Sequence, residues 1–221
     1  ALPIWNALFG LAYLWDPGSD WELGEAILND YAKELGFGFY RHYEENTGVT
    51  PEASPVIGHP PAFPPHPPDP DPAALDNMLK EWVNNNVHPG YGVVVWSTHG
   101  SSAGASGLMS SALCTHLDDA RPAFVFQGSC LNGYPESANN LGYALLRQGA
   151  IGTVSASRVS WSYCFSPPAN SNSGANCDLS YFYNRRLMNG EPAGRALYRT
   201  KDAVSHDWDW MNKMDFNLYG D

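Results

Sequence analysis

The sequence predicts an α/β fold, a three-layer α/β/α sandwich in which helices cover both faces of a mainly parallel β-sheet. Apolar runs such as VVV at 93–95 and AFVF at 123–126 alternate with segments whose apolar residues have helical spacing. Unbroken apolar strands are typical of parallel sheets that are buried on both faces, and strand–helix alternation is their usual pattern. The 221 residues, 43% of them hydrophobic, suffice for one core, so we expect a single domain over residues 1–221.

The first half of the chain contains two expected strands, two expected helices and a proline-rich segment. Residues 7–15 form an apolar strand, 21–36 have helical spacing, and 37–48 are an ambiguous second strand. Residues 51–72 contain ten prolines, which exclude a helix or a central strand. We expect this segment to be an exposed, stiff excursion, with helical spacing resuming over 73–87.

Expected strands and helices alternate in the second half, and no internal sequence repeat is visible. Strands are expected at 93–100, 122–130 and 150–159, and helices at 108–118, 137–149 and 179–190. The chain ends in FNLYGD at 216–221.

The charge and hydropathy of the chain exclude two classes of partner. A net charge of −11 argues against nucleic acid and anionic membrane surfaces. No segment approaches the roughly 20 consecutive apolar residues of a membrane span. The acidic excess is compatible with bound structural Ca²⁺ or with cationic substrates, and equally with solubility alone.

The four cysteines have different expected states. Cys164 and Cys177 bracket a polar loop, so we expect a disulfide between them. Cys114 lies on an expected helix face and is interpreted as a buried free thiol. The expected disulfide and the absence of an initiator methionine indicate export, so we expect a secreted or cell-surface protein.

Two apolar strands end near a reactive side chain, His99 in VVVWSTHG and Cys130 in PAFVFQGSC. Ligands of open α/β sheets bind beyond the carboxyl ends of the strands, so neighbouring strands would bring the two side chains together. A thiol with an imidazole beside it is the pair required for nucleophilic acyl transfer. The backbone N–H groups of Gly100 and Cys130 are candidates for an oxyanion hole, and Gly128 for a bend that presents the thiol. Alone, such a cysteine is more often a buried structural thiol, and such a histidine is more often a surface residue. No CxxC or HxxxH spacing near them indicates a zinc site.

These motifs resemble those of the caspase-like cysteine peptidases, which include caspases, legumains, clostripain and gingipains. The stretches STHG at 97–100, GSC at 128–130, residues 141–161 and FNLYGD at 216–221 are most similar to the gingipain family (peptidase family C25). The resemblance covers roughly residues 91–221. It implies a caspase/haemoglobinase-like fold, with the terminal segment packed back onto the domain.

The resemblance also implies roles for individual residues. His99 corresponds to the general base, Cys130 to the nucleophile, and the amides of Gly100 and Cys130 to the oxyanion hole. Trp161 corresponds to a wall of the pocket for the residue before the cut, although core packing is the alternative.

The segment Ser157 to Ser160 corresponds to the edge along which a peptide substrate adds as a strand. Arg158 lies within this segment and would repel a basic substrate side chain if it pointed inward. No motif identifies the acid that orients the histidine, for which the candidates are Asp16, Asp20, Glu44 and Glu45. The specificity acid is also unplaced.

The sequence therefore predicts a cysteine endopeptidase that acts on protein or peptide substrates through an acyl-enzyme. No cofactor is expected for the chemistry, structural Ca²⁺ has no assigned ligands, and a monomer is favoured. Two alternatives stay open. One is a catalytically inactive relative that binds peptides, and the other is a different thiol hydrolase or acyl transferase.

Overall fold

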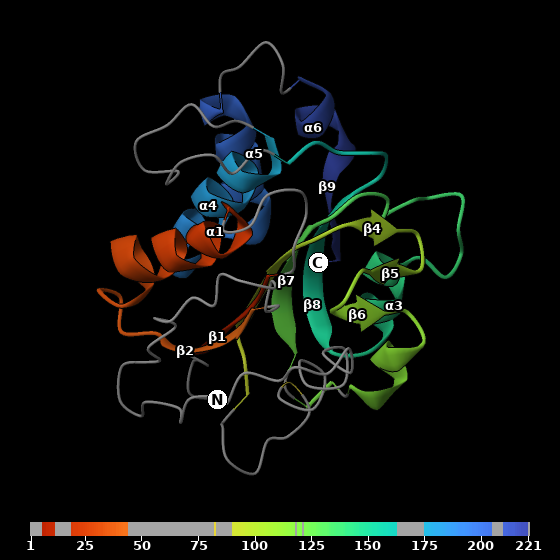
Figure 1. The fold of residues 1–221 in the computed structure, drawn as a ribbon, viewed down its shortest axis with the longest axis horizontal. Helices are drawn as coiled ribbons and strands as arrows, with labels where there is room; N and C mark the ends of the chain where they lie inside the picture. Colours follow the sequence, from red (N-terminus) through yellow and green to blue (C-terminus); the bar gives the residue numbers. More distant parts are fainter. Residues whose placement is uncertain are drawn as a thin grey trace.

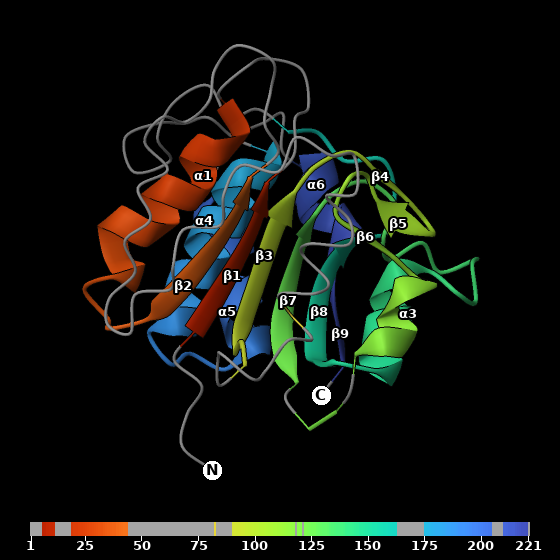
Figure 2. The same cartoon turned by 60° about the horizontal axis from the view of Figure 1, so that its bottom comes forward.

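A six-stranded sheet forms the centre of the molecule, in the order β2-β1-β3-β7-β8-β9 (Figures 1 and 2). The computed structural model describes residues 6–11, 19–43, 82, 90–117, 119–120, 122–162, 175–204 and 210–220. The strands are β1 (Asn6–Leu11), β2 (Gly38–Tyr43), β3 (Val93–Ser97), β7 (Ala123–Gly128), β8 (Ala150–Ala156) and β9 (Phe216–Gly220). All neighbouring strands are parallel except β9, which is antiparallel to β8. The mainly parallel sheet is confirmed.

Helices cover both faces of this sheet, so the three-layer prediction is confirmed as well. One face carries α1 (Ser19–Ile27), the π-helix η1 (Leu28–Ala32), α4 (Ala175–Met188) and α5 (Ala193–Ala203). The other face carries α3 (Leu141–Arg147), as Figure 2 shows. The short helix α6 (Trp210–Asp215) leads directly into β9 and packs against β8 and β9.

Each face of the sheet has its own apolar core. On one face, Val95 and Phe126 pack with side chains of α1 and α4, and Phe126 stacks on Phe216 at a centroid distance of 5.5 Å. On the other face, Trp96 and Val125 pack with α3 and are fully buried or nearly so. The unbroken apolar strands of the sequence are therefore explained, because alternate side chains enter different cores.

The predicted helix at 108–118 was wrong. This stretch is part of a small antiparallel sheet of β4 (Gly100–Ser101), β5 (Gly104–Ala105) and β6 (Met109–Ser110), followed by the 3₁₀ helix η2 (Leu113–His116). Ser110 and Ser111 in this stretch disfavour a helix, because Ser hydroxyls compete for backbone groups, and the serine- and glycine-rich residues before it form the partner strands.

The other expected elements differ mainly at their ends. The helix expected over 137–149 is α3, which starts only at Leu141 because the Asn140 side chain caps it by accepting from the Tyr143 N–H at 2.9 Å. Gly149 ends it with a φ of +90°. The expected first strand is described up to Leu11, and residues 12–15 and 51–72 lie outside the described part of the chain.

The cysteines agree with the prediction where they are described. Cys114 is a buried free thiol and Cys130 is also free, whereas Cys177 is disulfide-bonded. Its expected partner Cys164 lies outside the described residues.

Candidate active site

The loops that carry His99 and Cys130 are neighbours because β3 and β7 pair in parallel. Ser97 of β3 is paired with Gly128 of β7, and the Thr98 N–H continues the ladder by donating to the Gly128 carbonyl at 3.2 Å. Each reactive residue lies two positions beyond this last pair. The expectation that the two strands are adjacent is confirmed, and the small sheet rather than a helix connects them.

Gly100 lies directly against the backbone of the loop that carries Cys130, which we call the cysteine loop. A Cβ atom at this position would be 2.8 Å from both the Cys130 N and the Ser129 Cβ, and closer still to the Cys130 carbonyl oxygen. Gly128 is equally restricted, since its Cβ would lie 2.6 Å from the Trp96 carbonyl oxygen of β3. Gly128 therefore permits close approach of two strands, and the chain bends at the next residue, Ser129.

The side chain of His99 is exposed, and the small sheet fixes this residue through a hydrogen bond to its backbone carbonyl. The Ser106 N–H donates to the His99 carbonyl at 2.8 Å, and the Thr98 hydroxyl donates to the Ser106 carbonyl at 2.8 Å. Because β4 begins at the next residue, the histidine is placed between two hydrogen-bonded strands, β3 and β4.

Asn132 fastens the cysteine loop to the small sheet and is fully buried. Its Nδ2 donates to the Ser101 carbonyl at 2.7 Å and to the Gly104 carbonyl at 3.0 Å. Its Oδ1 accepts from the Ser129 hydroxyl, which in turn accepts from Trp96 Nε1 at 3.1 Å. Nothing in the sequence distinguished Asn132, apart from its place two residues after Cys130.

Replacing Asn132 by alanine is expected to destabilise the protein and to misplace the two loops. Two carbonyls in partly buried hydrogen bonds would lose their donor, at up to about 1–3 kcal/mol for each unsatisfied group. At roughly 2–4 °C per kcal/mol for a chain of this size, the melting temperature should fall by about 4–24 °C, measured by calorimetry. Asn132→Asp should also destabilise, although it preserves the acceptor for Ser129. A melting temperature unchanged by both substitutions would contradict this role.

The turn at Cys130 directs its sulfur toward the segment that follows β8. Leu131 has a left-handed backbone with φ +60°, a conformation that costs a non-glycine residue energy, and its N–H donates to the Arg158 carbonyl at 3.1 Å. The thiol donates to the Ser160 carbonyl at 3.3 Å, and the Ser160 N–H reaches the sulfur at 3.4 Å. Ser160, expected to bind substrate, is thus in contact with the thiol.

The first part of the expected substrate edge is already hydrogen-bonded. β8 is an internal strand between β7 and β9. Beyond the end of β8, the chain also makes a hydrogen bond to the last residue of α6. The Ser157 N–H donates to the Asp215 carbonyl at 2.8 Å, and the carbonyl of Arg158 is occupied by Leu131.

The second part of this edge leaves one residue with free backbone groups. The Trp161 N–H and carbonyl are both bonded to the side chain of Asn212, at 3.0 and 2.8 Å. Within the described part of this segment, Val159 is the residue whose backbone N–H and carbonyl both make no hydrogen bond. The side chains of Val159 and Trp161 are 57% and 50% exposed, so Trp161 is not a core residue.

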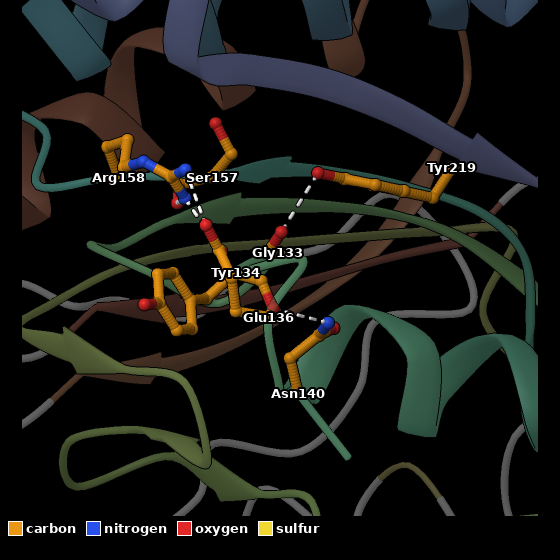
Figure 3. Close-up of polar contacts among 7 residues, drawn as sticks. All are labelled: Gly133, Tyr134, Glu136, Asn140, Ser157, Arg158 and Tyr219. Carbon is orange, nitrogen blue, oxygen red and sulfur yellow. Dashed lines mark hydrogen bonds and ion pairs between the residues drawn. The ribbon is translucent and has the colours of Figure 1, made fainter. Parts of the chain in front are cut away.

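The Arg158 side chain is held by the loop that follows Cys130 (Figure 3). Its guanidinium makes a bidentate ion pair with Glu136, at 2.8 and 3.0 Å, and lies 5.2 Å from the centre of the Tyr134 ring. The hydrogen bond from Arg158 lowers the pKa of the Glu136 carboxyl. The charge that would have repelled a basic substrate is therefore paired with a carboxylate.

Two further contacts fix the same loop (Figure 3). The Tyr219 hydroxyl of β9 donates to the Gly133 carbonyl at 2.9 Å, and the Asn140 side chain donates to the Tyr134 carbonyl at 2.9 Å. The terminal segment FNLYG thus packs back onto the sheet and supports the cysteine loop.

Other expected features lie outside the described residues or are not found within them. The side chains of Asp16, Asp20, Glu44 and Glu45 are not described. In the described ranges, no group of three or more His, Cys, Asp or Glu residues is arranged to hold a metal ion. No described helix is both long enough and apolar enough to cross a membrane.

Most of the chain matches one family of known proteins. A family model described as peptidase family C25 matches residues 24–221. The chain belongs to peptidase family C25. The resemblance to cysteine peptidases of the gingipain family is thereby confirmed. A comparison with curated proteins finds no match.

Solved structures of similar fold include gingipain structures. The crystal structure of the Arg-specific cysteine proteinase gingipain R has a TM-score of 0.65 at 16% identity and covers 99% of this C25 chain. A complex of the pro- and mature domains of Porphyromonas gingivalis RgpB gives 0.65 at 15% identity, with 99% of this chain covered. The C25 chain spans about half the length of these structures, 46% and 47% respectively. At these identities the likeness concerns the fold.

Proposed function

We propose that this C25 chain is a cysteine endopeptidase in which Cys130 is the nucleophile and His99 the general acid–base. The observation that carries the proposal is the packing of Gly100 against Ser129 and Cys130, which joins the His-Gly and Ser-Cys loops into one site. Family membership and the free state of the Cys130 thiol support it.

The proposed reaction proceeds through a thioester. The Cys130 thiolate attacks the carbonyl carbon of the scissile bond, and the resulting oxyanion is stabilised by the amides of Gly100 and Cys130. The His99 imidazolium gives its proton to the leaving amine as the C–N bond breaks. Water, which loses a proton to His99, then attacks the thioester and releases the acid and the thiolate.

The substrate is proposed to bind in extended form beside the segment that follows β8. The backbone of Val159 supplies the free N–H and carbonyl for strand pairing, and the exposed Trp161 supplies an apolar wall. The paired state of Arg158 leaves basic substrates acceptable. Secretion, a monomeric state and structural Ca²⁺ remain predictions from the sequence and the resemblance.

A library of peptidyl acyloxymethyl ketones tests the nucleophile directly. A member that fits is expected to alkylate Cys130 stoichiometrically, and its side chain would report the preferred residue before the cut. Cys114 should remain unlabelled, because burial raises the pKa of its thiol to about 12 and keeps it protonated. Labelled peptides identified by mass spectrometry provide the measurement. Folded protein labelled at Cys114 in preference to Cys130, or not labelled by any library member, would overturn the assignment.

A further inference from the structure

Cys130 is the end point of a chain of buried polar side chains that begins at the backbone of Trp161. Its members are Ser160, Asn176 at the start of α4, and Asn212 of α6, with exposed fractions of 7%, 3% and 1%. We call these three residues the amide network. None of them is expected to contact the scissile bond. No sequence motif identifies the two asparagines.

The backbone of Trp161 fixes the orientation of Asn212. The Trp161 N–H donates to Asn212 Oδ1 at 3.0 Å, and the Trp161 carbonyl accepts from Asn212 Nδ2 at 2.8 Å. A backbone N–H can only donate and a carbonyl can only accept, so the opposite orientation of the amide would lose both hydrogen bonds.

The orientation of Asn212 then determines that of Asn176. The second hydrogen of Asn212 Nδ2 is donated to Asn176 Oδ1 at 3.1 Å, so Asn176 presents its Nδ2 to the Ser160 hydroxyl oxygen, 3.0 Å away. The Asn176 N–H also donates to the Trp161 carbonyl, at 2.9 Å, which holds the start of α4 in place. Every amide in the network is satisfied in one orientation.

The direction of the Ser160 hydroxyl follows from this arrangement. Its oxygen accepts from Asn176, which leaves its own hydrogen for another acceptor, and the Cys130 sulfur lies 3.8 Å from the oxygen. The Ser160 N–H points to the same sulfur at 3.4 Å. The Ser160 carbonyl accepts from the neutral thiol at 3.3 Å. The two donors converge on the same sulfur and are the groups that can stabilise its negative charge in the attacking thiolate.

We propose that Asn176 and Asn212 are positioning residues that act through Ser160, by directing its hydroxyl hydrogen at the Cys130 sulfur and so favouring the thiolate. A donor to the charged form of an acid favours ionisation. The consequence for catalysis rests on the proposed function, but the effect on the thiol does not. The same two asparagines hold Trp161, so the substrate wall and the nucleophile share one support.

Reversal of the hydrogen-bond polarity at Asn176 tests the proposal. In Asn176→Asp a carboxylate of nearly the same shape can only accept, so the Ser160 hydroxyl turns toward it and away from the sulfur. We expect alkylation of Cys130 by iodoacetamide at pH 6–7 to slow about tenfold and its pH profile to move up by about one unit. Asn212→Asp should have a smaller effect in the same direction. Asn189→Asp, an exposed asparagine at the end of α4, is the matched control and should react like the unmodified protein.

A double-mutant cycle separates this role from general loss of structure. If Asn176 acts through Ser160, then Asn176→Ala slows alkylation in the unmodified protein but has no further effect in a Ser160→Ala background. Circular dichroism and melting temperatures show whether each variant is folded, and the cycle decides the question if Asn176→Asp does not fold. Additive effects in the cycle, or a folded Asn176→Asp that reacts normally, would overturn the proposal. Because alkylation needs no peptide, these results are independent of whether the protein proves to be a peptidase.

Discussion

Cys130→Ala is expected to abolish peptide cleavage while the protein stays folded. Loss of the proposed nucleophile removes the whole thioester route, and removal of the nucleophile of a serine peptidase costs on the order of 10⁶-fold in turnover. The fold depends little on this thiol, because a cysteine sulfur is a weak hydrogen-bond donor and acceptor in its contacts with Ser160. Cleavage of quenched peptides and a thermal melt provide the two measurements, and we expect a melting temperature within a few degrees of the original.

Cys114→Ala is the matched control for this variant. It removes the other described free thiol, which is buried beneath the small sheet and donates to the Ser110 carbonyl at 3.4 Å. This variant should lose some stability through the cavity it creates, yet keep its activity. Peptidase activity retained by Cys130→Ala would exclude Cys130 as the nucleophile. An inactive parent protein with a reactive Cys130 would instead favour a peptide-binding relative.

Gly100→Ala is expected to reduce kcat/KM by at least about 10²–10³-fold, the typical cost of losing one oxyanion donor. The added methyl group would overlap the Cys130 carbonyl and lie 2.8 Å from the Cys130 N, and backbone atoms cannot yield as a flexible side chain would. The cysteine loop or the histidine loop must therefore move. Steady-state kinetics on the best peptide of the library, with Cys130 alkylation rates beside them, measure the effect.

Gly194→Ala is the control for an added methyl group. Gly194 lies in the first turn of α5, is exposed, and would bring its Cβ no closer than 3.8 Å to Leu218. We expect unchanged activity and slightly higher stability, since alanine favours a helix over glycine by up to about 1 kcal/mol. A Gly100→Ala variant as active as Gly194→Ala would show that the two loops are not packed as the structure describes.

The layered fold was predictable from local patterns. Unbroken apolar runs such as 93–95 indicated strands buried on both faces, and strand–helix alternation indicated a parallel sheet, which β2, β1, β3, β7 and β8 form. The helix expected at 108–118 failed because Met109 and Ser110 pair as a short strand with the serine- and glycine-rich residues that precede them. Helical spacing over a short segment does not outweigh such residues.

The sequence by itself determined which residues are chemically capable at the site, because only a thiol and an imidazole beside glycines fit the motifs at His99 and Cys130. The tertiary structure alone decided what surrounds them. Asn132, Asn176 and Asn212 are ordinary residues in sequence, and they matter because folding buries them and brings their amides to carbonyls and hydroxyls far along the chain. A side-chain amide has no preferred partner in sequence, and its role is set by the donors and acceptors that burial leaves it to satisfy.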